Sequence, residues 1–281
     1  MTTTLRPERP EEPVPGGGRS RRWQICVNGR PVGGLRTTAL PWGTQWWGEI
    51  SELEVTDGRG RGRGTVGALA AEEVLRGWDC SRVDVRIPTE ATAAIRLAQA
   101  LGYTERMRNM AKHLDRAPDL PAAGLTTRPI GEAEFDDWLA RAKAGYLHDL
   151  GASGLTEQQA RAKSDTDHQH LLPQGPATPD VALRRLYDPE GTPLGSLWVA
   201  LRQSVLANGA PLAWVMTVEV DREQRGRGYG RALMLLAERE CLAAGVRDLG
   251  LNVFSSNTVA TGLYDSLGYR VTHRVLGKSL L

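Results

Sequence analysis

Alternating apolar and polar positions predict strands along this chain, and apolar positions three and four residues apart predict helices. The segment 23–38 alternates around Asn28-Gly29, a pair that favours a two-residue turn, so it predicts a β-hairpin. The same criterion predicts further strands at 48–55, 83–87, 103–114, 181–187, 194–206, 211–220 and 249–254. Helices are predicted at 66–76, 91–101, 132–150 and 257–267. Another helix is predicted to begin at a capping box at 156–159, and a further one lies after the strand at 211–220 and ends at about residue 244. The hairpins predict an α/β (α+β) fold with mixed, mostly antiparallel sheets flanked by helices.

The order of these elements occurs twice. Each half has a strand, a loop of glycine and arginine, a helix, a strand, a helix and then Leu-Gly-Tyr, at 101–103 and again at 267–269. With Gly64 aligned to Gly228, the repeat predicts two tandem domains, of which the first is abbreviated because it lacks the two opening helices of the second. The expected boundaries are a disordered tail at 1–22, a first domain at 23–114, a linker at 115–124 and a second domain at 125–281.

Composition narrows the class of protein. The 281 residues are 41% hydrophobic with a net charge of +2, which supports real cores and gives no strong signal for nucleic acid. The three cysteines show no metal-ligand spacing, so no metal is expected, and they fit a reducing compartment. No apolar run reaches membrane-spanning length and the N-terminal segment lacks a signal-peptide core, so we expect a cytoplasmic protein without a membrane partner.

The most informative segment lies between the strand at 211–220 and the helix after it. Gly226, Gly228 and Gly230 alternate with arginines there. A helix N-terminus presents unpaired N–H groups and partial positive charge, glycines let an anion approach the backbone, and arginines pair with phosphates. The loop is therefore predicted to bind a diphosphate. It lacks the Gly-Lys-Ser/Thr of a Walker loop, and hairpin-linked strands do not suit a dinucleotide-binding fold.

Two motifs in this order resemble the GNAT superfamily of N-acyltransferases. The segment 225–230 is similar to that family's R/Q-x-x-G-x-G/A loop, which binds the pyrophosphate of acetyl-coenzyme A. The second motif is similar to the family's N-x-x-A-x-x-L-Y-x-x-L-G-F/Y segment, and here it comprises Asn257, Ala260, Leu263, Tyr264, Leu267, Gly268 and Tyr269. The resemblance covers 125–281 well and 23–114 more weakly, which implies two tandem GNAT-like domains similar in arrangement to the mycothiol synthases.

The resemblance implies roles for individual residues. The main chain of Val218 and Val220 would pair with the pantetheine arm, Asn257 would hydrogen-bond it, and Tyr264 would protonate the departing thiolate. Glu219 is the candidate general base, and a water-relayed carboxylate elsewhere is the alternative. The diphosphate would be held by the backbone of Arg225, Gly226, Arg227, Gly228, Tyr229, Gly230 and Arg231.

The first half departs from the pattern. With Gly64 aligned to Gly228, Val66 takes the place of Gly230. At the position of Tyr264 stands Ala98, and at that of Asn257 stands Ala91. We therefore expect the first domain to be non-catalytic. His168 and His170 lie two residues apart on a predicted helix, where their side chains diverge, so a solvated helix face is expected rather than a metal site.

The predicted function is an acetyl-CoA-dependent N-acetyltransferase, in which an amine attacks the thioester directly in a ternary complex. The partners are acetyl-CoA and an amine-bearing acceptor that the sequence does not identify, and the protein is expected to be a monomer or homodimer. Two alternatives stay open, namely an acyl-CoA-binding pseudoenzyme or sensor, and a nucleic-acid-binding protein that uses its RG tracts. Near-neutral charge and the absence of clustered aromatic and basic stripes argue against the last of these.

Overall fold

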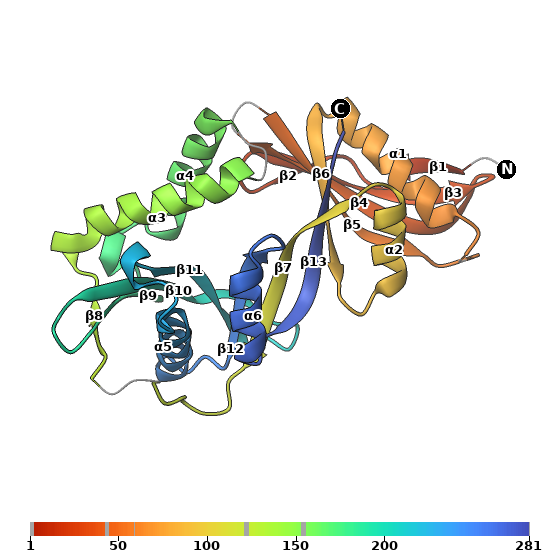
Figure 1. Cartoon of the computed structure of the whole chain (residues 1–281). Helices are drawn as coiled ribbons and strands as arrows, with labels where there is room; N and C mark the ends of the chain where they lie inside the picture. Colours follow the sequence, from red (N-terminus) through yellow and green to blue (C-terminus); the bar gives the residue numbers. More distant parts are fainter. Residues whose placement is uncertain (1–2, 43–44, 59, 121–123, 153–155, 281) are drawn as a thin grey trace. The chain divides into compact units, whose positions relative to one another are not determined.

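The computed structural model describes residues 3–42, 45–58, 60–120, 124–152 and 156–280 (Figure 1). The chain divides into two compact units, each built from segments that are not adjacent in sequence. The first unit comprises Met1–Met107, Gln158–Lys163 and His273–Leu281, and the second comprises Arg108–Glu157 and Ser164–Thr272. We describe each unit by itself.

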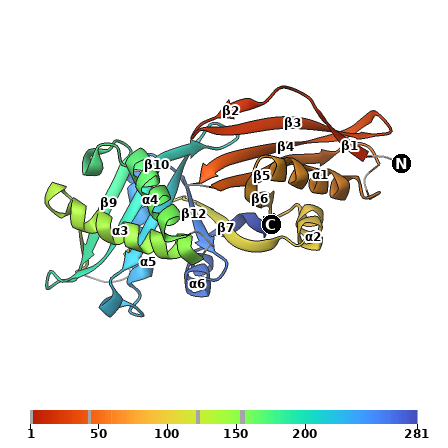
Figure 2. The same cartoon turned by 90° about the horizontal axis from the view of Figure 1, so that it is seen from above.

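The first unit is a sheet in the order β1-β3-β4-β5-β6-β13, with β2 also paired to β3, and it carries two helices. Both helices lie on one side of this sheet (Figure 2). Its elements are β1 (Thr3–Pro7), β2 (Glu12–Val14), β3 (Gly18–Val27), β4 (Arg30–Trp42), β5 (Gln45–Val55), α1 (Arg63–Gly77), β6 (Cys80–Pro88), α2 (Thr92–Ala100) and the larger part of β13 (Arg270–Ser279).

The second unit is a sheet in the order β7-β12-β11-β10-β9-β8 with helices on both faces. The helices α3 and α4 cover one face, and α5 and α6 cover the other (Figure 1). Its elements are the larger parts of β7 (Thr104–His113) and α4 (Glu157–Leu171), together with β8 (Thr126–Pro129), α3 (Glu132–Ala152), β9 (Val181–Tyr187), β10 (Pro193–Val205), β11 (Pro211–Val220), α5 (Tyr229–Ala243), β12 (Asp248–Phe254) and α6 (Thr258–Ser266), with the short 3₁₀ turns η1 (Gly175–Ala177) and η2 (Arg222–Gln224).

The elements follow the hydrophobic pattern closely, and the predicted fold class is confirmed. The hairpin at Asn28-Gly29 has positive φ at both turn residues, 47° and 81°, as a type I′ turn requires. The strands β8 and β13 were not predicted from the pattern. Between β1 and β3 the first unit has only residues 8–17, which include the short β2. At the corresponding place, between β8 and β9, the second unit has the helices α3 and α4.

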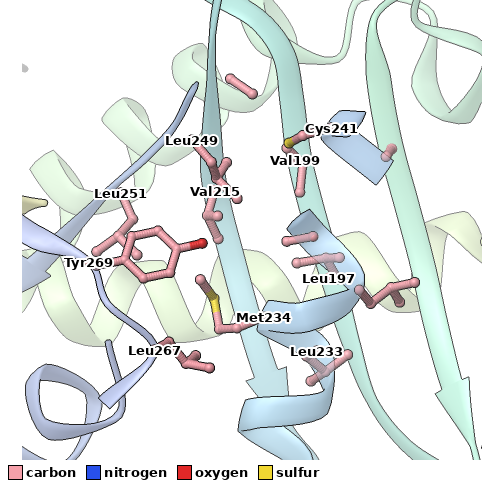
Figure 3. Packing of buried hydrophobic residues seen from close by; sticks show 14 of the residues in the cluster. Leu197, Val199, Val215, Leu233, Met234, Cys241, Leu249, Leu251, Leu267 and Tyr269 are labelled. Carbon is pink, nitrogen blue, oxygen red and sulfur yellow. The ribbon is translucent and has the colours of Figure 1, made fainter. Parts of the chain in front are cut away.

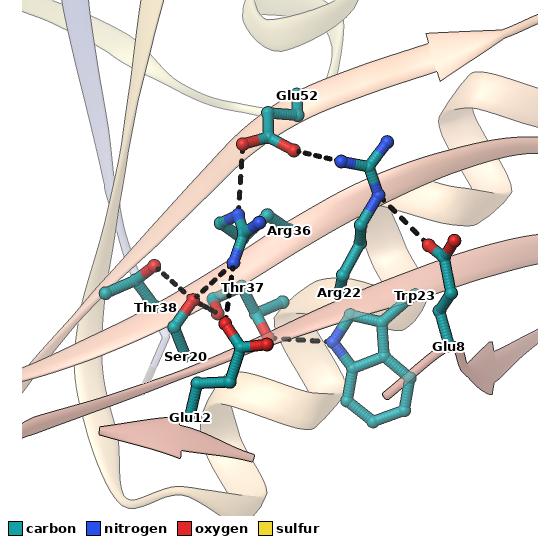
Figure 4. Close-up of polar contacts among 9 residues, drawn as sticks. All are labelled: Glu8, Glu12, Ser20, Arg22, Trp23, Arg36, Thr37, Thr38 and Glu52. Carbon is teal, nitrogen blue, oxygen red and sulfur yellow. Dashed lines mark hydrogen bonds and ion pairs between the residues drawn. The ribbon is translucent and has the colours of Figure 1, made fainter. Parts of the chain in front are cut away.

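The N-terminal segment differs from the disordered tail that its composition predicts. Its residues form β1, β2 and the start of β3, and Leu5 packs against the core of the first unit. Its charged side chains form ion pairs rather than remaining solvated, since Arg22 bridges Glu8 and Glu52, each at 3.0 Å (Figure 4). Composition alone does not indicate this outcome, because pairing between neighbouring strands satisfies the backbone hydrogen-bonding groups and brings opposite charges together.

Each unit is completed by a strand from the other half of the chain. Residues of β13 pair antiparallel with β6, from His273–Pro88 to Ser279–Arg82, and Leu276 and Leu280 are buried in the first unit's core. In the second unit, β7 neighbours β12 and contributes Met110 to the core, and Leu114, directly after β7, is buried there as well. The boundary between the compact units therefore does not coincide with the linker expected at 115–124, of which 121–123 lie outside the described residues.

A buried ion pair holds each of these two strands. Lys278 Nζ lies 2.8 Å from Glu72 Oε2 in the first unit, and Lys112 Nζ lies 2.7 Å from Glu238 Oε1 in the second. Both glutamates are almost fully buried on a helix, at 1% and 2% exposure. The two pairs are related by the same 166-residue shift as the Leu-Gly-Tyr tripeptides, so the repeat includes the strand that each half donates.

The sheet of the second unit separates two apolar clusters, one under α5 and one under α3. Apolar residues of α5, among them Leu233 and Met234, pack on β10, β11 and β12 (Figure 3). Val218 and Val220 pack against this core from β11. On the other face of the sheet, Trp138 of α3 packs with Trp198 and Met216 in a separate cluster.

Candidate functional site

The two central parallel strands of the second unit diverge along their length. β11 and β12 are paired from Leu212–Asp248 to Val215–Leu251, and no pair follows. At the point of divergence β11 contains a bulge at Met216, because Trp198 of β10 pairs with Thr217 whereas the next residue pairs with Val215. The result is a fork in the sheet between β11 and β12.

The main chain of β11 is open on the fork side. The N–H of Asp221 donates to the carbonyl of Leu194 at 3.0 Å, so the peptide groups of that residue point toward β10. Successive residues in a strand alternate in this respect, so the N–H and C=O groups of Val220 and Val218 point away from β10 and toward the fork. A ligand that enters the fork meets backbone donors and acceptors there.

The glycine-arginine loop follows directly and leads into α5. Gly226 and Gly228 have φ of 78° and 86°, and Gly228 is the N-cap of α5. A Cβ at either position would meet no atom within 4 Å, so the space above this backbone is open. At Gly230 a Cβ would lie 3.3 Å from Leu263 Cδ2, which shows that this glycine lets α5 approach α6.

The arginines of this loop are exposed and contact neighbouring groups. Arg225 Nε donates to the carbonyl of Val220 at 3.3 Å, and Arg227 Nη1 donates to Gln224 Oε1 at 3.2 Å. Arg231, on the first turn of α5, donates to Ser266. These bonds are weak in water, so the guanidinium groups can exchange them for phosphate oxygens.

The second motif lies on α6. Asn257 is the N-cap of this helix, and its Oδ1 accepts from the N–H of Ala260 at 3.0 Å. This cap leaves the side-chain Nδ2 of Asn257 as a donor. Tyr264 lies about two turns after Asn257 on α6, and its ring lies edge-on to that of Tyr269. Burial raises the pKa of the Tyr264 phenol above its usual value.

Glu219 lies on the face of β11 opposite to the α5 core, because its neighbours Val218 and Val220 pack into that core. Its cross-strand partner is Ser196, which accepts from Trp138 Nε1 of α3 at 3.2 Å. The carboxylate therefore lies on the α3 side of the sheet, across from α5 and α6.

The corresponding loop of the first unit corrects the alignment used above. Gly62, with φ of 74°, is the N-cap of α1 and matches Gly228, whereas Gly60, with φ of 79°, matches Gly226. Gly64 matches Gly230, since a Cβ there would lie 3.5 Å from Leu97 Cδ2 of α2. The shift is thus 166 residues throughout, and Val66 does not replace the final glycine. Arg59 lies outside the described residues.

The histidines on α4 also differ from expectation. His170 is exposed, but His168 is buried at 6% exposure with its Nδ1 2.7 Å from the carbonyl of Ser164. Its ring contacts Trp198 and Tyr146, and burial lowers the pKa of His168. His168 is buried because its ring packs against Trp198. The mostly polar composition of α4 gave no indication of this burial.

Comparison with known proteins decides the family. The model of the acetyltransferase (GNAT) family matches residues 4–103 and again 155–269. The chain belongs to the GNAT family. It is an N-acetyltransferase with two GNAT regions, and the predicted tandem architecture is confirmed.

Two mycothiol acetyltransferases are among the relatives that align with most of this chain. The chain is 32% identical over 216 residues to a mycothiol acetyltransferase of Thermobispora bispora, an alignment that covers 74% of this chain and 68% of the relative. It is 27% identical over 287 residues to the mycothiol acetyltransferase of Saccharomonospora viridis, with 95% and 87% coverage.

Solved structures show the same fold. A GCN5-related N-acetyltransferase from Sphaerobacter thermophilus superposes with a TM-score of 0.61 at 22% identity, over 92% of this chain and 80% of that one. A tandem GNAT protein from the clavulanic acid biosynthesis pathway superposes with a TM-score of 0.56 at 20% identity, over 96% and 85%. Within the part of the GNAT chain that the structure describes, no helix is long and apolar enough to span a membrane.

Sequence reasoning missed one polar feature of the site. Asn109 of β7 and Asn252 of β12 form a side-chain hydrogen bond of 2.9 Å beside the fork. No motif contains either residue, and they lie 143 positions apart, so only the pairing of the donated strand reveals them.

Proposed function

We propose that the second unit transfers an acetyl group from acetyl-CoA to an amine by direct attack in a ternary complex. The observation that carries this proposal is the fork between β11 and β12, with open backbone on one strand and a positive-φ glycine loop at its end. Acetyl-CoA is the cosubstrate of the GNAT family, and the residues present fit it.

The fit is stereochemical. The peptide groups of Val218 and Val220 that point into the fork would pair with the amides of the pantetheine arm as an added strand does, and Arg225 Nε would give up its 3.3 Å bond to the Val220 carbonyl. The unfilled space above Gly226 and Gly228 would admit the diphosphate to the helix N-terminus, where backbone N–H groups and Arg225, Arg227 and Arg231 compensate its charge. Asn257 would donate its free Nδ2 to the pantetheine arm.

Tyr264 would supply the proton in the reaction. The amine nitrogen attacks the thioester carbon, the carbon–sulfur bond breaks, and the Tyr264 hydroxyl gives its proton to the departing sulfur. A thiol has a pKa near 8.5 and a phenol one near 10, so the phenol is protonated when it is needed. Burial raises the pKa of Tyr264 further and keeps it in the donor form throughout the neutral range.

Replacement of Tyr264 by Phe tests this role. We expect kcat to fall by about a hundredfold or more, the usual contribution of a positioned general acid, while the affinity for acetyl-CoA is unchanged. In the wild type, deprotonation of Tyr264 removes activity only as pH rises through its raised pKa, so kcat should not decline below about pH 10 on its account. An unchanged kcat in Tyr264→Phe, measured by free-thiol release, would remove this residue from the mechanism.

Glu219 would accept the proton from the attacking amine. Its carboxylate faces the α3 side, across the sheet from the helices that carry the diphosphate loop and Tyr264, and it is partly exposed there. An alkyl amine is mostly protonated at neutral pH and must lose a proton before it attacks.

Replacement of Glu219 by Gln should lower kcat/KM by about tenfold to a hundredfold near pH 7. The deficit should shrink as pH approaches the pKa of the amine, because the amine then deprotonates without help. A pH profile of kcat/KM for both proteins checks this. A constant deficit across the profile would assign Glu219 a structural role instead.

The first unit would not perform this chemistry. Its loop retains all three glycines, but Ala98 and Ala91 stand where the second unit has Tyr264 and Asn257. It would lack both the proton donor and the side-chain cap at α2, where no side-chain cap bond is present.

The proposal as a whole is tested by incubating the protein with acetyl-CoA and a panel of amines while free thiol is measured. The acceptor of the mycothiol acetyltransferases is the first candidate, because those relatives align over most of the chain, and simple primary amines complete the panel. Amine-dependent thiol release with intersecting initial-rate patterns would support direct transfer. Thiol release that does not depend on amine, or none at all, would contradict it.

A further inference from the structure

The Asn109–Asn252 pair lies at the point where the fork opens. Val215–Leu251 is the last pair between β11 and β12, so Asn252 is the first residue of β12 beyond it. Leu251 and Val253 on either side are buried in the α5 core, which places Asn252 on the opposite face, the α3 side. Asn252 is exposed there.

The same face at the fork carries an aromatic residue. Trp214 pairs with Gly250, and its ring lies so close that a Cβ at Gly250 would be 2.3 Å from Trp214 Cζ3. Asn252 lies two residues further along the same strand and face. The face thus combines an indole surface with an exposed amide directly beside the backbone that would hold the pantetheine arm.

The hydrogen bonds determine what Asn252 can offer. Asn109 Nδ2 donates to Asn252 Oδ1 at 2.9 Å, so the oxygen of Asn252 is already used and its Nδ2 remains as an exposed donor. Asn109 itself is only 6% exposed, and its backbone carbonyl accepts from Thr272 Oγ1 at 3.2 Å, which holds it in place. Its buried Oδ1 has no partner among the described residues.

The fold does not require this pair. With the 166-residue shift, Asn252 corresponds to Arg86 and Asn109 to Val275, and these two residues are cross-strand partners in the first unit. In the first unit an arginine and a valine therefore occupy the two positions that the asparagines occupy in the second. Burying Asn109 with an unsatisfied oxygen costs stability, so its presence in the second unit alone calls for a role other than packing.

We propose that Asn252 binds the acceptor by donating from Nδ2 to an oxygen atom close to the acceptor's amine, and that Asn109 is the positioning residue that fixes this orientation. The inference rests on the proposed acetyl transfer. A neutral amide suits the site because, unlike a carboxylate, it does not stabilise the protonated, unreactive form of the amine. The acceptor class is thus an amine with an ether, hydroxyl or carbonyl oxygen near the nitrogen.

Two probe amines of equal length test this preference, 2-methoxyethylamine and n-butylamine. The ether oxygen only accepts hydrogen bonds, and it replaces a methylene group. The ratio of kcat/KM for the two amines is measured in wild type and in Asn252→Leu, so that intrinsic differences between the amines cancel. We expect the ratio to fall by about tenfold in Asn252→Leu, the effect of one hydrogen bond, with KM for acetyl-CoA unchanged.

Variants of Asn109 separate positioning from folding. Asn109→Asp keeps the size but removes the donor, so Asn252 turns its Nδ2 toward the carboxylate and presents its oxygen to the acceptor, and the preference for the ether is lost. Arg86→Ala, at the matching position of the first unit, should leave the ratio unchanged. Ratios equal to wild type in both Asn252→Leu and Asn109→Asp would overturn this inference, whereas failure of the wild type to acetylate either amine would overturn the proposed function itself.

Discussion

Replacing Gly228 with Trp should abolish the binding of acetyl-CoA while the protein stays folded. The indole would occupy the open space above the N-terminus of α5, where a side chain now meets no atom within 4 Å. The diphosphate would then lose its backbone donors and the partial charge of the helix. We expect affinity to fall by at least about a hundredfold, equivalent to ~2.7 kcal/mol, in a calorimetric titration.

The matched control is Gly62→Trp, which makes the same change at the N-cap of α1. Both glycines are in the left-handed region, so a tryptophan costs about 1–2 kcal/mol of strain at either position and the two variants should lose similar stability. Only the Gly228 variant should lose the binding that supports turnover. Loss of that binding in the Gly62 variant alone would move the working site to the first unit.

Replacing Lys278 with Met should destabilise the first unit strongly. Glu72 is 1% exposed and has both carboxylate oxygens within 3.1 Å of Lys278 Nζ, with Arg76 further away at 3.8 Å. Without the lysine a buried carboxylate loses its main partner, which we expect to lower the free energy of unfolding by about 2–4 kcal/mol. Urea denaturation followed by circular dichroism measures this change.

Two variants control that experiment. Replacing Glu72 with Met in the same protein should restore most of the lost stability, because no buried charge is then left unpaired. Arg22→Met breaks the exposed ion pairs with Glu8 and Glu52 in the same unit and should cost about 1 kcal/mol or less. If Lys278→Met and Arg22→Met prove equally mild, the buried pair does not hold β13 in place.

Local patterns were sufficient for most of the fold and for the existence of a glycine-arginine loop between β11 and α5. The turn at Asn28-Gly29 and the loop around Gly228 each depend on the conformation of a few adjacent residues, and Asn28, Gly29 and Gly228 all have positive φ. Such features are encoded locally because only glycine and asparagine adopt these conformations at low cost.

Features that depend on pairing between distant segments of the chain could not be predicted from the sequence. Alternation predicts that residues 103–114 form a strand but not which sheet edge receives it, so the exchange of strands could not be predicted. The alignment of Gly64 with Gly228 failed because an RG repeat matches itself equally well when shifted by two residues. The Asn109–Asn252 pair is a consequence of the exchange, since Asn109 comes from the first half of the chain and lies in the second unit.

The donated strand β13 also has a consequence for the order in which the chain folds during synthesis. The first unit needs residues 273–279 beside β6, although its other strands are made far earlier. Until the ribosome has added residues 273–279, β6 has an open edge and Glu72 has no lysine beside it. The N-terminal half must therefore wait in an incomplete state with an edge able to pair with other nascent chains, and it closes only when the C-terminal half has been made.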